Sequence, residues 1–142
     1  MLKYGMLRND VCAIGTLPVF SSPNIEKTAD FYCNILGFKR RDYVQKNPSR
    51  ICLYRGDASL ILVQSRKREV VSCHEVCGYG YDAYFLSEEP SQFQIEFKKK
   101  GVKVVRNLTF SYYATHDEFV LEDIDGRWIA FGFKRMQRGK RA

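Results

Sequence analysis

The chain has 142 residues, of which 45% are hydrophobic, and these values suit one domain with a sizeable buried core. No apolar run approaches the roughly 20 residues that a membrane-spanning helix needs, and residues 1–12 lack the apolar stretch of a signal peptide. The five cysteines are odd in number and scattered, which argues against a disulfide framework. We therefore expect a cytoplasmic protein that does not enter membranes.

The formal charge of +7 is concentrated at the carboxyl end of the chain. The basic tail, residues 134–142, contains five Lys or Arg side chains and no acid, and without them the formal charge falls to +2. Such a tail can contact nucleic acid or an acidic surface. Neither a recognition helix nor an aromatic ribonucleoprotein motif accompanies it, so we expect a solvated terminus and no nucleic-acid partner.

The first half of the chain predicts one strand, one helix and three further strands. Asn24 suits the N-cap of the helix, its apolar residues recur at helical spacing, and Gly37 suits its end. Asn47–Pro48 breaks the strand that follows. The predicted elements are a strand at 11–21, a helix at 25–36, a strand at 38–46 and a hairpin at 50–64 that turns at Gly56–Asp57.

The second half repeats this order after a mixed, weakly periodic stretch, residues 66–78, which we interpret as a linker. Its predicted elements are a strand at 81–86, a helix from Pro90 to Gly101, a strand at 102–108 and a hairpin at 116–133 that turns at Asp125–Gly126. Two modules, about residues 11–66 and 78–134, thus share the order βαβββ. This order predicts a single α+β domain whose helices cover the outer sheet faces. The inner faces then border a shared curved-sheet cleft where a ligand can bind.

Three stretches carry a family resemblance. They are LPVFSSPNIEKTADFYCNILGF at 17–38, LYRGDASLILV at 53–63 and LEDIDGRWIAFGF at 121–133. Over about residues 11–133 the chain resembles the glyoxalase/bleomycin resistance/dioxygenase superfamily, also called vicinal oxygen chelate proteins, and its first hairpin resembles that of bleomycin-resistance proteins in particular. That likeness implies a homodimer with ligand clefts at the subunit boundary. It does not fix the activity, because this fold hosts isomerases, dioxygenases, transferases and binding proteins.

The resemblance also implies four positions for a divalent metal. Enzymes of the superfamily hold the metal with histidine, glutamate and glutamine on the inner faces of the first, fourth, fifth and eighth strands. Carried over one at a time, these positions fall on Leu17, on Ile61 or Leu62, near Asp82, and on Ala130. Only Asp82 has a metal-binding side chain. We therefore predict neither a metal cofactor nor a catalytic set of residues.

Two other groups contain metal-binding or acid–base side chains. Cys73, His74 and Cys77 are potential zinc ligands, but their spacing matches no standard structural site and no fourth ligand is evident. We interpret them as part of the linker. His116 is a candidate acid or base, yet the two acidic residues after it point to opposite faces of a strand and no nucleophile accompanies it.

Aromatic residues with polar tips form the more informative pattern, because such walls suit flat or amphipathic organic ligands. Tyr54, Tyr84 and Trp128 fall on strands that should border the cleft, and Trp128 shares a strand face with Ala130. The predicted ligand-binding residues are Tyr54, Tyr84, Trp128, His116, Asp82, Arg50 and Tyr113.

The sequence therefore predicts a metal-independent homodimer that binds a small aromatic or antibiotic-like molecule without a cofactor. Arg40, Arg41 and Arg50 can make the cleft electropositive, which favours a neutral or anionic ligand over a cationic one. The alternative is a metal-dependent lyase, isomerase or dioxygenase of the same superfamily. Its displaced site would recruit Asp82, His116 and one of the nearby glutamates, Glu118 or Glu122.

Overall fold

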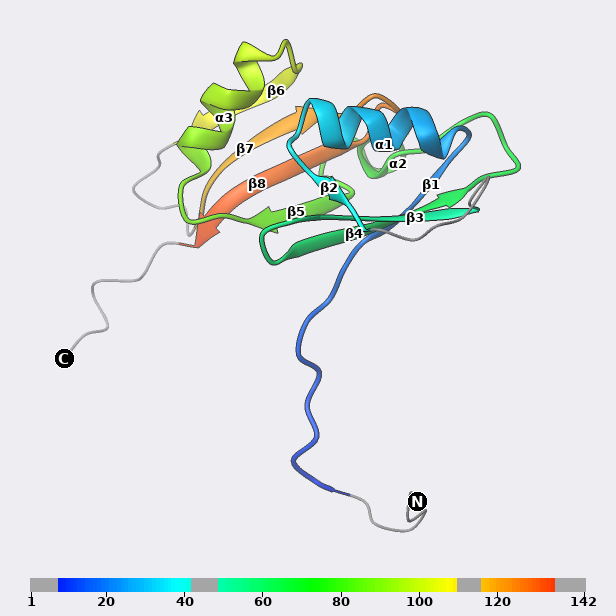
Figure 1. The fold of residues 1–142 in the computed structure, drawn as a ribbon. Helices are drawn as coiled ribbons and strands as arrows, with labels where there is room; N and C mark the ends of the chain where they lie inside the picture. Colours follow the sequence, from blue (N-terminus) through cyan, green and yellow to red (C-terminus); the bar gives the residue numbers. More distant parts are fainter. Residues whose placement is uncertain (1–7, 42–48, 110–115, 135–142) are drawn as a thin grey trace, which may run out of the picture.

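The computed structural model describes residues 8–41, 49–109 and 116–134, without the side chains of residues 116 and 134 (Figure 1). Its elements are β1 (Val19–Ser22), α1 (Ile25–Asn34), β2 (Lys39–Arg40), β3 (Arg50–Arg55), β4 (Ala58–Gln64), α2 (Cys73–Cys77), β5 (Ala83–Leu86), α3 (Pro90–Lys99), β6 (Val104–Thr109), β7 (His116–Glu122) and β8 (Trp128–Lys134). The predicted α+β class and the repeated order βαβββ are confirmed, with α2 as an addition between the copies.

Each copy forms a four-stranded sheet. The first sheet has the order β1-β4-β3-β2 and the second has the matching order β5-β8-β7-β6. In each sheet the first pair is parallel and the other pairs are antiparallel. The helix α1 packs on the first sheet and α3 on the second, and both lie on the same side of the molecule (Figure 1). The opposite sheet faces are therefore not covered by the two long helices.

Strict alternation along the strands determines which side chains enter the core. The helix-facing side chains of β3, β4, β7 and β8 are almost fully buried; they include Ile51, Leu53, Leu60, Leu62, Phe119, Leu121, Ile129 and Phe131. Because neighbouring residues of a strand point to opposite faces, Ile61 and Tyr54 lie on the other face of the first sheet. Trp128, Ala130 and Gly132 lie on the corresponding face of the second sheet, as the sequence predicts.

The turn between β7 and β8 connects the two modules through buried polar side chains. Arg127 is 3% exposed, and its Nη1 donates to Asp123 Oδ2 and Asp125 Oδ2, each at 3.1 Å. Asp123 in turn accepts a hydrogen bond of 2.7 Å from Tyr32 Oη of α1, and Asp125 accepts one of 2.6 Å from Thr28 Oγ1. Buried charges require such partners. The turn that the sequence identifies as a chain reversal therefore also positions the second sheet against α1.

A second polar contact between the modules centres on Arg55 at the end of β3. Its Nη1 donates to Glu96 Oε2 of α3 at 2.7 Å and to the Leu36 carbonyl at 2.7 Å. The guanidinium also lies over the Phe93 ring, 4.4 Å from its centre. These contacts hold the end of α1 beside α3.

The prediction of a first strand over residues 11–21 is wrong for residues 11–18. Only Val19–Ser22 pair with β4, and the last ladder bond on this side runs from Ile61 N to the Pro18 carbonyl. Pro18 has no N–H to continue the ladder. Towards residue 8 the chain instead runs away from the body of the protein (Figure 1), and the Ile14 side chain is fully exposed.

Residues 66–78, which we interpret as a linker, contain the short helix α2, Cys73–Cys77, which the sequence did not predict. Gly78 ends it in the left-handed conformation, with φ +82°. Of the strand predicted at 38–46, only Lys39–Arg40 form β2, and residues 42–48 lie outside the described part of the chain, as do Tyr113 and residues 135–142 of the basic tail. No helix within the described residues is long and apolar enough to cross a membrane; the cytoplasmic location stays a prediction.

Candidate functional site

The uncovered face of the second sheet carries a tyrosine that lies across the neighbouring strand. Tyr84 of β5 pairs with Ala130 of β8, and its ring lies over Gly132. A Cβ atom at Gly132 would overlap Tyr84 Oη and would lie 2.6 Å from Tyr84 Cζ. The absence of a side chain at Gly132 therefore makes room for the Tyr84 ring on this face.

Tyr84 belongs to a polar cluster that centres on Glu118 of β7. Glu118 accepts hydrogen bonds from Arg106 Nη2 at 2.6 Å and from Tyr84 Oη at 3.5 Å. Burial, followed by the nearby Glu118 charge, raises the pKa of Tyr84 to about 12, and burial together with a hydrogen bond to Glu118 raises the pKa of Tyr81. Both phenols thus stay protonated at neutral pH and can donate hydrogen bonds.

The short helix α2 covers Trp128 on the same face. The His74 ring stacks on the indole, with 3.9 Å between the ring centres and 7° between the planes. His74 Nε2 also lies 3.0 Å from the Gly126 carbonyl. At the start of α2 the Cys73 N–H donates to Asp82 Oδ1 at 3.1 Å. The connection between the modules therefore packs on the second sheet and encloses part of its uncovered face.

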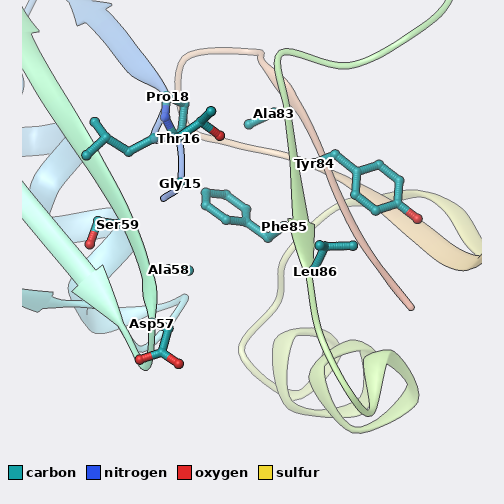
Figure 2. Close-up of a pocket in the computed structure, with 11 residues that line it drawn as sticks. Gly15, Thr16, Pro18, Asp57, Ala58, Ser59, Ala83, Tyr84, Phe85 and Leu86 are labelled. Atoms are coloured by element: carbon teal, nitrogen blue, oxygen red, sulfur yellow. The ribbon is translucent and has the colours of Figure 1, made fainter. Parts of the chain in front are cut away.

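One cavity in the described part of the chain lies at the junction of the modules. This junction cavity has a volume of about 600 Å³ and is lined by residues 15–18, 57–59 and 83–86. Figure 2 shows that Phe85 points into it from β5, whereas the Tyr84 side chain points away. The β3–β4 turn places Asp57, Ala58 and Ser59 on the opposite wall.

A smaller cavity lies on the uncovered face of the second sheet, beside α2. This loop cavity has a volume of about 240 Å³ and is lined by residues 78–81 together with Val105, Arg106, Val120 and Trp128. Gly78 and Gly80 both have positive φ, +82° and +98°, which suits glycine. Their conformations bring Tyr79 and Tyr81 over the sheet.

The four positions that the superfamily uses for metal do not supply a metal-binding set here. Leu17 lines the junction cavity, and Ala130 is fully buried. Strand alternation resolves the second position as Ile61, because the neighbouring Leu62 points into the core. Asp82 Oδ2 is buried and has no hydrogen-bond partner among the described residues, but its neighbours at the other positions are hydrocarbon side chains. Carboxylate, imidazole or thiolate groups are what such metals require.

The alternative metal site also finds no support in the described residues, which contain no group of three or more His, Cys, Asp or Glu that could hold an ion. Glu118 binds Arg106, and Glu122 accepts from Lys103 Nζ and Trp128 Nε1, each at 3.3 Å. The His116 side chain lies outside the described part of the chain. The side chains that the structure describes therefore do not supply a donor set for the family metal.

The predicted ligand-binding residues fall into two groups. Tyr84, Trp128 and Asp82 lie on the second sheet or at its edge, whereas Tyr54 and Arg50 lie on β3 of the first sheet. The Arg41 guanidinium covers the Tyr54 ring at 4.7 Å. Tyr113 and the His116 side chain lie outside the described residues, so their roles stay predictions.

Sequence reasoning missed three residues that shape this face. They are His74, Tyr81 and Arg106. The run GYGYD at 78–82 offered a signal for Tyr81, since two glycines between tyrosines are typical of a tight aromatic loop. No local pattern pointed to Arg106, because its partner Glu118 is 12 residues away on the next strand.

Solved structures with the same fold come from several bacteria. TioX from Micromonospora sp. ML1 aligns with a TM-score of 0.63 and 14% identity over 85% of this chain and 100% of its own. TnmS3, an antibiotic binding protein from Streptomyces sp. CB03234, has a TM-score of 0.62 and 19% identity over 88% and 100%. A glyoxalase/bleomycin resistance protein from the same Streptomyces strain has a TM-score of 0.58 and 19% identity over 82% and 98%. At these identities the likeness shows the fold alone.

Comparison of the sequence itself with known proteins identifies the family. No curated protein sequence matches the chain. A family model described as Glyoxalase/Bleomycin resistance protein/Dioxygenase superfamily matches residues 18–131, which is most of the chain. The chain belongs to the glyoxalase/bleomycin resistance protein/dioxygenase superfamily.

Proposed function

We propose that the chain is a metal-independent binding protein for a small organic molecule of aromatic or antibiotic-like character. The observation that carries this proposal is the junction cavity. Its volume of about 600 Å³ falls within the range of about 300–1,000 Å³ that is usual for small-molecule sites. Phe85 and Leu17 supply apolar surface, and Ser59 adds a hydroxyl. Apolar walls with few polar groups are typical of sites that bind organic compounds.

Two further observations support the proposal. Hydrocarbon side chains occupy three of the four positions that the resemblance assigns to the metal. A binding protein accounts for them directly, whereas a metalloenzyme would require a metal site elsewhere in the chain. TnmS3, which shares the fold, is described as an antibiotic binding protein. Because Asp57 is the only Asp, Glu, Lys, Arg or His among the described lining residues, the cavity favours neutral parts of a ligand over its charged groups.

A cavity-filling variant tests the site. A panel of planar aromatic compounds is titrated calorimetrically against the wild type, Ser59→Phe and the exposed control Ser91→Phe on α3, with and without a chelator. We expect that at least one compound binds the wild type with micromolar affinity and that the chelator does not change this affinity. Ser59→Phe should weaken the binding about tenfold or more, since the added ring fills the cavity, and Ser91→Phe should not. A panel without any binder tighter than millimolar, or equal affinity in both variants, contradicts the proposal.

Elemental mass spectrometry of the chelator-free protein separates the binder from the metalloenzyme. We expect less than about 0.1 metal ion per chain after incubation with manganese, iron, nickel or zinc, because the donor set is incomplete. About one ion per chain, lost in Asp82→Ala, would instead establish the displaced metal site.

We also propose a homodimer, as the family resemblance implies. Exposed apolar side chains at and beside β1 support it, since Leu17 before the strand is 43% exposed, Val19 on β1 is 60% exposed and Val63 on β4 is 37% exposed. Apolar side chains grouped on an exposed sheet face are typical of an interface. Light scattering after size exclusion should give the mass of two chains, and Val19→Glu should shift it to that of one. A wild type that remains a single chain at high concentration would reject the dimer.

A further inference from the structure

The loop cavity is separate from the junction cavity and is built within one chain. Its lining comes from the connection before β5 and from β6, β7 and β8 of the second sheet, with no residue of the first module. A site there needs neither the junction cavity nor a second copy of the chain. It therefore goes beyond the function proposed above and can be tested independently of it.

The charge that faces the loop cavity is positive. Arg106 lines it, whereas Glu118, its ion-pair partner at 2.6 Å, does not. The Glu118 carboxylate accepts from Tyr84 Oη and from Arg106 Nη2, and it also hydrogen-bonds with Tyr81 of the lining. A guanidinium has five N–H donors in a planar fork; the bond to Glu118 uses one of them, and Tyr81 also contacts the guanidinium. The Arg106 side chain is 52% exposed, so a bound anion can reach the remaining donors.

The rest of the lining is suited to a flat ring. Trp128, Tyr79 and Tyr81 contribute aromatic surface, and the Val120 side chain lies on the same sheet face as Trp128. His74 already covers one face of the indole, so a ring in the cavity contacts its remaining surface. The volume of about 240 Å³ is below that of sites for drug-sized molecules and accommodates a single substituted ring.

We propose that the loop cavity binds an aromatic ring that carries an anionic oxygen, as in an aromatic carboxylate or phenolate, with Arg106 as the anion-binding residue. The aromatic surface of the cavity contacts the ring of such a ligand, and the Arg106 guanidinium binds its anionic oxygen. The Glu118 pair orients the guanidinium before the ligand arrives, which reduces the entropy lost on binding. Tyr81 forms an edge contact with Tyr84, 5.6 Å between ring centres, and so holds the wall in position.

Benzoate is the probe, and uncharged benzamide is its control. Trp128 is the only tryptophan of the chain, so its indole N–H gives a single resonance that reports on this cavity. We expect that benzoate shifts this resonance saturably, and that Arg106→Gln lowers the benzoate affinity about 10- to 100-fold, the usual range for a hydrogen bond between charged groups. The affinity for benzamide should change no more than about threefold. Arg106→Lys, which keeps the charge, should retain part of the benzoate affinity.

Lys103→Gln is the matched control, because Lys103 is a cation immediately before the same strand, β6, but does not line the cavity. It should leave the benzoate affinity within about twofold of the wild type, since its exposed charge is screened. Ser59→Phe, which fills the junction cavity, should have no effect on the indole shift. No saturable shift with benzoate, or equal losses in Arg106→Gln and Lys103→Gln, would overturn the proposal. A shift abolished by Ser59→Phe would assign the ligand to the junction cavity instead.

Discussion

At the scale of single residues, the most constrained position on the uncovered face is a glycine in a regular strand. Gly132 does not have a left-handed backbone, so its requirement is one of space. The Tyr84 ring occupies the volume that a side chain would take, and Glu118 Cβ would lie 3.0 Å from an added methyl group. The orientation of Tyr84 therefore depends on the absence of a side chain across the strand pair.

Gly132→Ala should lower the free energy of unfolding by about 1–3 kcal/mol, the usual cost of adding a methyl group to a packed site. Gly15→Ala is the control, because an added Cβ there meets no atom within 4 Å, and it should change stability by less than about 0.5 kcal/mol. Urea denaturation measures both. Equal stabilities of Gly132→Ala and the wild type would mean that Tyr84 is free to leave the strand surface.

At the scale of elements, the β7–β8 turn contributes more than a chain reversal. Asp123 is 5% exposed, and its Oδ1 accepts the Asp125 N–H at 2.9 Å and the Arg127 N–H at 3.0 Å. Burial raises the pKa of Asp123, and the Arg127 charge opposes the rise. Arg127 Nη2 donates to the Ser21 carbonyl of β1. The turn thus satisfies its own backbone and binds the first module with the same three side chains.

Asp123→Ala should destabilise the protein by about 3–5 kcal/mol, because it leaves the buried Arg127 charge and the Tyr32 hydroxyl without their main partner. Asp57→Ala in the exposed β3–β4 turn provides a carboxylate control and should cost less than about 0.5 kcal/mol. Denaturation curves of the two variants give the comparison. Similar values for both would show that the buried pair adds nothing beyond a surface charge.

At the scale of the whole molecule, two repeated modules become one structural unit through contacts between them. The Asp123–Arg127 turn reaches α1, Arg55 of β3 binds Glu96 of α3, and the Phe38 and Phe85 rings meet 5.7 Å apart. The buried residues of both sheets form one continuous cluster. A shared core and buried cross-links favour a single cooperative transition. Trp128 fluorescence, which reports on the second module, should therefore follow the same denaturation curve as far-UV circular dichroism.

Acid should weaken the link between Arg55 and Glu96. The hydrogen bond from Arg55 lowers the pKa of Glu96 below its usual value of 4.5. A carboxyl with a lowered folded-state pKa contributes stability above its unfolded-state pKa and loses it as the pH falls through the folded-state value. Wild type should therefore exceed Glu96→Gln in stability at pH 7, and the difference should shrink as the pH falls below about 4.5. Glu88→Gln, an exposed carboxylate before α3, is the control and should show no such convergence in urea denaturation.

The sequence by itself predicted the elements other than α2, their order and the faces of the strands. Apolar residues alternate along 50–64 and 116–133 with the period of a strand, and those of 25–36 recur with the period of a helix, so local geometry determines which side chains are buried. The family resemblance also assigns Ala130 to a position where related enzymes hold a metal, and a methyl group cannot bind an ion.

Only the tertiary structure decided how far the first strand extends and which side chains meet on the uncovered faces. Residues 11–18 have the composition of a strand, but their ladder with β4 begins only at Val19, since Pro18 has no N–H to extend it. Arg106 and Glu118 pair across a bulged strand register, and His74 reaches Trp128 from 54 positions away. Such contacts depend on how the sheets twist and pack, which no spacing within one segment encodes.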